Sequence, residues 1–320
     1  MTPAEAKEMR EGVALSNLDQ PLFEGSDATK RDLIDYLEGV SDRMLPELRR
    51  RPLSVIRVHR GEGPFMQKNL PKYTPEWVDR VTFWAESSKR DVTYALCDDL
   101  RTLLWFGNQR AIEFHPSLAQ VDAPDRITHL VLDLDPPEGS SFATVVAAAR
   151  LVREVLGDLD LAGALKTSGA KGLHIYVPID AGTPPGDAVA ATGAIAERVA
   201  ARDPELATTA FMKENREGKV FIDATRVGGA TVVSAYSPRA RPGTPVSLPI
   251  YWDELDDIVP SSVTVKNALG VLGDRDPWAD EMPPPQTVPS ELVDEGSRLP
   301  PVRVQAMHEG LRRSRAKKSS

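Results

Sequence analysis

The chain has 320 residues and a formal net charge of -8, with 41% hydrophobic and 27% charged residues. This composition is typical of a folded globular protein, and the length allows one large or two small hydrophobic cores. The negative charge argues against a protein that coats nucleic acid through an overall positive potential. No apolar run approaches the ~20 residues that span a bilayer, no signal-peptide pattern is present, and the single cysteine, Cys97, cannot form an internal disulfide. We therefore expect a cytoplasmic protein without membrane contact.

The first 115 residues predict a lobe of mixed helices and strands. Asp27 or Thr29 can cap a helix that runs through about Leu45, because apolar residues recur there at helical spacing. The stretch 61–75, rich in Gly, Pro and Lys, predicts a long loop. The other predicted elements are a strand over 51–58, a strand over 93–99, a helix over 99–111 and a strand over 111–116.

The middle of the chain has the clearest alternation of apolar and polar residues. It predicts a strand over 127–135, a helix over 140–157, strands over 163–168 and 172–179, a helix over 186–203 and a strand over 218–225. This β-α-β-β-α-β order is that of a ferredoxin-like or RRM-like unit, so we expect an α+β fold. In that unit the first strand lies between the third and the fourth.

Two aspartates stand two residues apart in the first of these strands. Side chains at alternate positions share one face of a strand, so Asp133 and Asp135 lie opposite the leucines that alternate with them. The same alternation places His174 of the third strand and Asp223 of the fourth on that face. We therefore expect three carboxylates and an imidazole together on an open face of the sheet.

Carboxylates this close repel one another unless a proton or a cation lies between them. Mg²⁺ and Mn²⁺ prefer carboxylate oxygens, and a two-metal site built from three aspartates suits phosphoryl or nucleotidyl transfer. Beside these aspartates, the segment KTSGAKGLH offers backbone amides with Ser168, Lys171 and His174, which together could cradle a triphosphate. Taken alone, the acid pair could belong to a strand end that runs into a turn, and the glycines to a plain hairpin turn.

Several ordered motifs resemble a known family. The runs LVLDLDP, KTSGAKGLHIYVP, GKVFID and AYSPRAR are similar to those of the polymerase domain of bacterial DNA ligase D, a member of the archaeo-eukaryotic primase superfamily. The resemblance extends from about Leu15 to Leu255. Because no nuclease region and no ligase-type lysine motif is apparent, the chain is interpreted as a free-standing relative.

The resemblance implies a primase-polymerase fold for residues 1–275. An N-terminal α/β lobe would occupy about 1–115 and an RRM-like catalytic core about 116–255, followed by a Pro-rich and basic tail over 276–320. In that tail we expect an extended segment, wrapping the domain or running free, and then a short helix with a basic end.

The resemblance also implies roles for individual residues. Asp133, Asp135 and Asp223 would be catalytic metal ligands, and Ser168, Lys171 and His174 would contact the triphosphate. On the resemblance alone, His115, Arg216 and Arg239 would be further nucleotide or catalytic-centre contacts, although His115 could simply end a strand and the arginines could be surface charges. DNA-contact residues would be Lys30, Phe65 and Lys68.

Two positions depart from the family pattern. A lysine that commonly grips a DNA 5′-phosphate together with the counterpart of Lys30 is replaced here by Gln20. An amide cannot supply the ion-pair part of phosphate binding, so a preference for 5′-phosphorylated gaps is in doubt. Where the family often has two aromatic residues, this chain has Phe65 followed by Met66, which reduces template stacking to one ring.

The leading hypothesis is a metal-dependent, template-directed polymerase that adds nucleotides from NTPs or dNTPs to a primer 3′-hydroxyl. The resemblance implies short gap filling on primer-template or gapped DNA in end joining or excision repair. A monomer near the nucleoid, acting with a separate DNA ligase and an end-binding protein, would fit this role. Two alternatives are a non-catalytic RRM-like module that binds single strands, which would stack bases on exposed aromatic residues, and a metal-dependent nuclease or phosphohydrolase.

Overall fold

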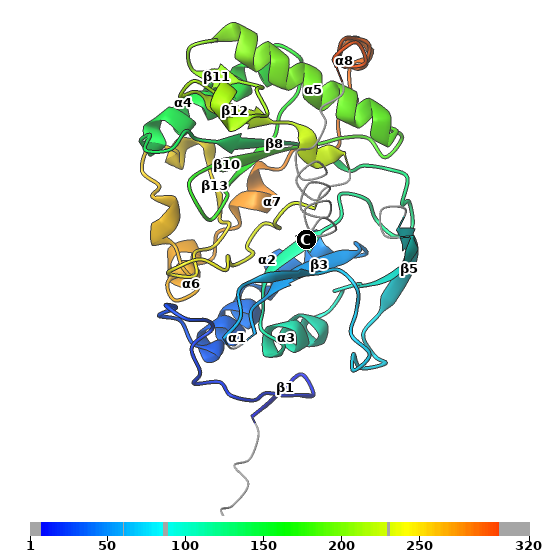
Figure 1. Cartoon of the computed structure of the whole chain (residues 1–320), viewed down its shortest axis with the longest axis vertical. Coiled ribbons are helices and arrows are strands. Elements are labelled where there is room, and N and C mark those ends of the chain that lie inside the picture. The colour runs from blue at the N-terminus through cyan, green and yellow to red at the C-terminus, as the bar shows by residue number, and fades with distance from the viewer. Residues whose placement is uncertain (1–7, 60, 86–88, 229–230, 301–320) are drawn as a thin grey trace, which may run out of the picture.

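The computed structural model describes residues 8–59, 61–85, 89–228 and 231–300. Two lobes lie one above the other, a sheet with two long helices at the top of the view and a smaller mixed lobe below it (Figure 1). The second half of the chain returns to the lower lobe, where α6 (Ala268–Leu272) packs beside α1 (Lys30–Gly39). None of the described helices is both long and apolar enough to cross a membrane.

The lower lobe is built on a five-stranded sheet that is covered by helices. Its strands are β3 (Leu53–Arg57), β4 (Phe65–Gln67), β5 (Arg80–Ala85), β6 (Arg90–Ala95) and β7 (Ala111–Pro116), in the order β4-β3-β6-β5 with β7 paired to β3. Its other elements are α1, α2 (Ser41–Leu48), α3 (Leu100–Asn108) and a small hairpin of β1 (Met9–Arg10) and β2 (Val13–Ala14).

Three sequence predictions for this lobe need correction. The helix capped by Thr29 does not run unbroken to Leu45, because α1 ends at Gly39 and a second helix starts at Ser41. Gly39 packs against Leu269, so close that a Cβ atom at this position would clash with that side chain. The stretch expected to be a loop contains β4, and β5 was not predicted. β4 has only three residues, and both strands lie at the edges of the sheet.

The upper lobe has the predicted β-α-β-β-α-β unit. In chain order it consists of β8 (His129–Asp135), α4 (Phe142–Gly157), β9 (Ala164–Thr167), β10 (Leu173–Pro178), α5 (Pro185–Arg202) and β12 (Val220–Asp223). Two short strands, β11 (Ala207–Thr208) and β13 (Pro249–Ile250), extend the sheet to the order β11-β12-β8-β10-β9-β13. The first strand of the unit therefore lies between the third and the fourth, as predicted.

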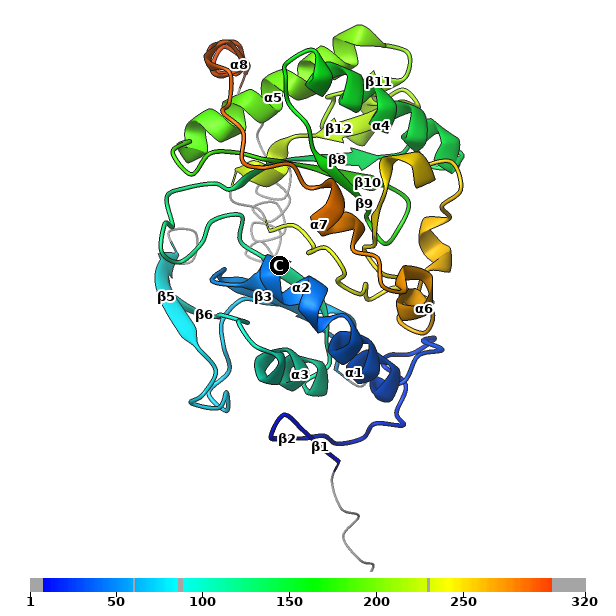
Figure 2. The same cartoon turned by 180° about the vertical axis from the view of Figure 1, so that it is seen from behind.

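The two faces of this sheet differ in chemistry. Leu130, Leu132 and Leu134 are fully buried, and α4 and α5 cover one face of the sheet (Figure 2). The opposite face, which bears Asp133 and His174, is turned toward the lower lobe and is not open as expected: both side chains are about 5% exposed. The reason is that the chain after β12 crosses in front of this face, where the backbone of Ser234 bonds to β7.

The segment after Asp276 is not simply extended. It forms α7 (Pro277–Glu281) and α8 (Ser290–Gly296), and it packs on the upper lobe. Trp278 is buried with its ring 5.1 Å from that of Tyr176, and Gly296 lies so close to the Ala190 carbonyl that no side chain would fit there. The short helix and basic end predicted beyond residue 300 lie outside the described residues.

Candidate active site

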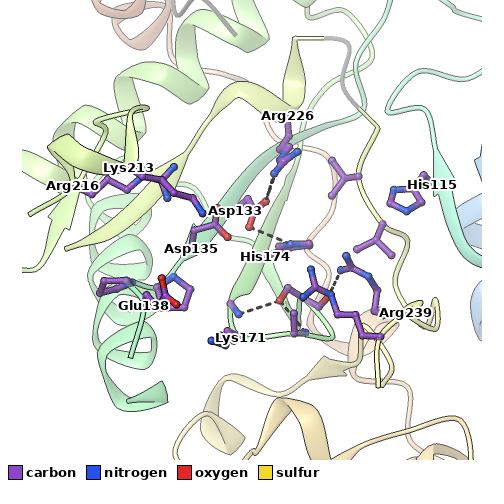
Figure 3. A pocket seen from close by; sticks show the side chains of 18 of the residues that line it. His115, Asp133, Asp135, Glu138, Lys171, His174, Lys213, Arg216, Arg226 and Arg239 are labelled. Carbon is purple, nitrogen blue, oxygen red and sulfur yellow. Dashed lines mark hydrogen bonds and ion pairs between the residues drawn. The ribbon is translucent and has the colours of Figure 1, made fainter. Parts of the chain in front are cut away.

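The acidic side chains meet where β12 pairs with β8. Asp223 is the cross-strand partner of Asp133, and Asp135 lies two residues further along β8 on the same face. The guanidinium of Arg226 lies between the first two. Its Nη2 is 3.0 Å from Asp133 Oδ2 (Figure 3), and its Nε is 3.3 Å from Asp223 Oδ2. Arg226 was not predicted, although its position three residues after Asp223 returns it to the strand end through a short 3₁₀ turn.

The charges of these groups are strongly coupled. Burial and the neighbouring charge of Asp133 raise the pKa of Asp135 to about 6. Burial acts in the same direction on Asp133, but His174 and Arg226 outweigh it and hold the pKa of Asp133 below its ordinary value. The charge of Asp133 is thus compensated by its neighbours, whereas Arg226 and Arg216 compensate that of Asp135 only in part, so the site favours an additional positive charge.

The donor set fits a hard divalent cation, since all three groups offer carboxylate oxygens. Within the described part of the chain, however, no three acidic, His or Cys side chains stand in a ready-made metal cage. The guanidinium of Arg226 instead contacts oxygens of Asp133 and Asp223 that a cation would need. A cation bound here would have to replace these contacts.

The turn between β9 and β10 is tightly built. The Ser168 hydroxyl accepts hydrogen bonds from the amides of Ala170 (3.2 Å) and Gly172 (3.1 Å). A Cβ atom on Gly172 would lie 2.3 Å from the Leu134 carbonyl oxygen, so only glycine fits there. Lys171 of this turn is exposed and lines the cavity described below (Figure 3). The structure therefore gives Ser168 a part in shaping the turn and leaves Lys171 accessible to a ligand.

A buried glutamate connects two of the predicted nucleotide contacts. Glu113 on β7 accepts a hydrogen bond from His115 Nε2 at 2.9 Å and is ion-paired with Arg239 Nε at 3.2 Å. Its other oxygen accepts from the Ala240 amide at 2.9 Å, and Arg239 donates to the Ser168 carbonyl. Burial acts to raise the pKa of Glu113, but the bond from His115 and the charge of Arg239 lower it to about 2. Glu113 was not predicted, although its alternation with His115 along the strand is a visible signal.

A cavity of about 750 Å³ brings most of the predicted site together, a volume within the usual range for ligand sites. Eight predicted residues line it: His115, Asp133, Asp135, Ser168, Lys171, His174, Arg216 and Arg239. Asp223 is not among the lining residues and lies beside Arg226. Three further cations that were not predicted as contacts also line the cavity: Lys213, Arg226 and Arg241. The cavity is therefore rich in positive charge although the whole chain is acidic.

Comparison with known proteins decides the family. Residues 29–278 match the family model described as LigD, primase-polymerase domain. The chain belongs to this family. It is 35% identical over 257 residues to the multifunctional non-homologous end joining DNA repair protein LigD of Mycobacterium tuberculosis. This alignment covers 77% of the chain and 34% of that protein. It is 32% identical over 294 residues to the bifunctional non-homologous end joining protein LigD of Bacillus subtilis, covering 90% and 47%.

A solved structure supports the same assignment. The polymerase domain of Mycobacterium tuberculosis ligase D in complex with DNA superposes with a TM-score of 0.77 at 32% identity, covering 85% of this chain and 99% of that one. The predicted family, α+β fold class and polymerase-type enzyme class are confirmed. The chain spans only about a third to a half of the length of the curated LigD relatives.

The predicted DNA-contact residues of this LigD-family domain do not line the cavity. Phe65 on β4 packs on His59 with ring centroids 4.8 Å apart, and Lys68 just after that strand is exposed. Lys30, by contrast, is only 2% exposed and donates to the Ser16 carbonyl at 2.6 Å. Burial and the nearby charge of Arg110 lower the pKa of Lys30 to about 8.

Arg110 was not predicted as part of this cluster. Its guanidinium donates to Gln20 Oε1 at 3.1 Å and to the Leu22 carbonyl at 3.0 Å. Gln20, the residue that departs from the family pattern, is therefore in contact with an arginine. A second cation is present beside Lys30 even though position 20 carries none.

Proposed function

We propose that this domain is a metal-dependent, template-directed nucleotidyltransferase that extends a primer 3′-hydroxyl by nucleoside monophosphates and releases pyrophosphate. The observation that carries the proposal is the shared cavity, because carboxylates suited to a divalent cation line it together with Lys171 of the turn and several arginines. This pairing matches the two needs of phosphoryl transfer, which are activation of the attacking oxygen and stabilisation of charge on the phosphates.

Asp133, Asp135 and Asp223 would hold Mg²⁺ or Mn²⁺. The bound cations would assist deprotonation of the 3′-hydroxyl and stabilise the leaving pyrophosphate. Arg226, which neutralises two of these carboxylates in the metal-free protein, would then be released to interact with phosphate oxygens. The only partly compensated charge of Asp135 supports cation binding at this point of the sheet.

The cations of the cavity would bind the triphosphate. Lys171 lies on the turn, while Arg239 is anchored to the same turn through the Ser168 carbonyl. Arg216 stacks on Phe221 with its guanidinium carbon 3.9 Å from the ring centroid, which fixes its direction at the other side of the cavity. An arginine held in this way loses little further freedom on binding phosphate.

We further propose that the nucleic-acid substrate is primer-template or gapped DNA and that the reaction fills short gaps in repair. The solved relative is a complex with DNA, and the LigD relatives are end joining proteins. Phe65 and Lys68 would contact the template, and Lys30 with Arg110 would bind a 5′-phosphate. A monomer at the nucleoid that works with a separate ligase and an end-binding protein fits this role.

The structure disfavours a non-catalytic RRM-like module. Such modules stack bases on exposed aromatic residues of the central strands. Here the rings on the corresponding face, Tyr176 and Phe221, are buried at 6% and 3% exposure. A nuclease on the same acids would cleave strands and would not lengthen them, so the products distinguish the two reactions.

The test is primer extension on a gapped duplex with Mg²⁺ or Mn²⁺ and with NTPs or dNTPs. Asp133→Ala and Asp135→Ala should each abolish extension, whereas Asp274→Asn, a change at an exposed carboxylate, should not. Full activity in either alanine variant would refute the assignment of these carboxylates.

A further inference from the structure

A fully buried lysine lies behind the candidate metal site. Lys166 on β9 has 0% exposure, and its Nζ is 2.8 Å from His174 Nδ1 and 2.7 Å from Ser247 Oγ. Lys166 is the cross-strand partner of His174, which is in turn the partner of Asp133. Three polar side chains therefore lie in a row across three neighbouring strands and end at a candidate metal ligand.

The direction of the hydrogen bonds in this row follows from what each group can do. The Ser247 hydroxyl donates to the Thr167 carbonyl at 2.8 Å, so its oxygen is an acceptor for Lys166. In its ammonium form Lys166 has three protons to donate and no lone pair with which to accept, so in this form it donates to His174 Nδ1. His174 must then carry its own proton on Nε2, which lies 3.3 Å from Asp133 Oδ1.

Both ring nitrogens of His174 are thus engaged within the protein. This differs from the role that the resemblance implies, in which His174 contacts the triphosphate. The two oxygens of Asp133 have different neighbours. Oδ1 faces His174, while Oδ2 accepts a hydrogen bond from Arg226 Nε at 3.1 Å. Residues that orient a metal ligand in this way commonly change metal affinity or activity by 10- to 100-fold when they are removed.

We propose that Lys166 is a positioning residue that fixes His174 as its Nε2-protonated tautomer and so orients Asp133 for cation binding. The catalytic part of this inference rests on the proposed function, but the tautomer does not. Burial of a lysine among neutral partners is costly, and a role in directing this row explains why the sequence places one on β9.

A purely structural role would give different results. Lys166 also joins β9 to the segment before β13 through Ser247, so its removal could lower stability without any effect on His174. Ser247→Ala is the matched control, because it removes this structural link and leaves the bond between Lys166 and His174 in place.

The experiment uses the full chain labelled with ¹⁵N-histidine, without metal, and reads the tautomer from the ring nitrogen shifts. His174 is assigned by loss of its signals in His174→Asn. The parent and Ser247→Ala should show the Nε2-protonated form. The double variant Lys166→Met/Asp133→Ala, which removes both groups that favour this form, should show a mixture. Asp133→Ala is expected to fold even if Lys166→Met does not. Its His174 should retain the Nε2-protonated form, because Lys166 alone still directs the tautomer.

Activity provides a second readout. Lys166→Met should lower kcat for primer extension about 10- to 100-fold and change KM for the nucleotide by less than about threefold. An Nδ1-protonated His174 in the parent, the Nε2-protonated form alone in the folded double variant, or a mixture in Asp133→Ala would overturn the proposal. Absence of extension by the parent would contradict the proposed function instead, while the tautomer would still decide the role of Lys166.

Discussion

Replacing Glu113 by glutamine tests whether one buried carboxylate holds two proposed nucleotide contacts in place. Glu113 accepts from His115 and the Ala240 amide and is ion-paired with Arg239. Glutamine keeps the size of the side chain and removes its charge. His115 and Arg239 both line the cavity, so we expect Glu113→Gln to weaken folding stability and nucleotide binding together.

The magnitude follows from the pKa of Glu113. Its surroundings lower this pKa from 4.5 to about 2, which corresponds to about 3 kcal/mol of preference for the ionised form in the folded state. Because the folded pKa is lowered, this stabilisation is fully present above pH 4.5 and is lost as the pH falls toward 2. Glu113→Gln should therefore lower the free energy of unfolding by about 2 to 3 kcal/mol at pH 7, and the difference should shrink below pH 4.5.

The assay is urea unfolding at pH 7 and at pH 3.5, with Glu24→Gln, a change at an exposed position, as the control. Steady-state primer extension should show a KM for the nucleotide raised about tenfold, since the His115 and Arg239 side chains both lose their orientation. If Glu113→Gln unfolds like the control and binds the nucleotide like the parent, the carboxylate does not hold these residues and the reasoning is wrong.

Further predictions concern the metal ligands and the DNA end. Asp135→Asn should raise the thermal stability of the metal-free protein at pH 7.5, because burial and Asp133 raise the pKa of Asp135 to about 6 and make its ionised form unfavourable. This gain should shrink as the pH falls below 6. Added Mn²⁺ should reverse it, because the cation stabilises the parent more than the variant. Equal thermal stability of parent and variant in EDTA would contradict the repulsion between Asp133 and Asp135. Arg110 should restore a preference for a 5′-phosphate despite Gln20, so Arg110→Ala should reduce the rate advantage of a 5′-phosphate over a 5′-hydroxyl about tenfold. A parent enzyme indifferent to the 5′-phosphate would show that Gln20 has removed this preference.

The core of the fold could be predicted from the sequence because its strands are long and alternate clearly. The alternation in β8 placed Asp133 and Asp135 opposite three buried leucines, and the strand order then brought Asp223 beside them. The missed strands are short or lie at sheet edges: β1, β2, β4, β5, β11 and β13. Their existence depends on neighbours that are distant in the sequence.

The residues that surround the acids could not be predicted in the same way. Arg226, Glu113 and Lys166 act through tertiary contacts with groups on other elements. Only Glu113, which alternates with His115 along β7, has a signal in its immediate sequence, and nothing there distinguishes the other two from surface charges or buried strand residues. The acidic face was expected to be open for a related reason. The segment that covers it has no regular alternation, so its path depends on bonds such as that from Ser234 to the Phe114 carbonyl.

Measuring pyrophosphate release together with primer length on one gapped duplex tests the central claim most directly. With a complementary nucleotide and Mn²⁺ or Mg²⁺, we expect one pyrophosphate for each nucleotide added and no product when EDTA is present. Cleavage of the primer, or binding of the duplex without growth in either metal, would contradict the assignment of this cavity to nucleotidyl transfer.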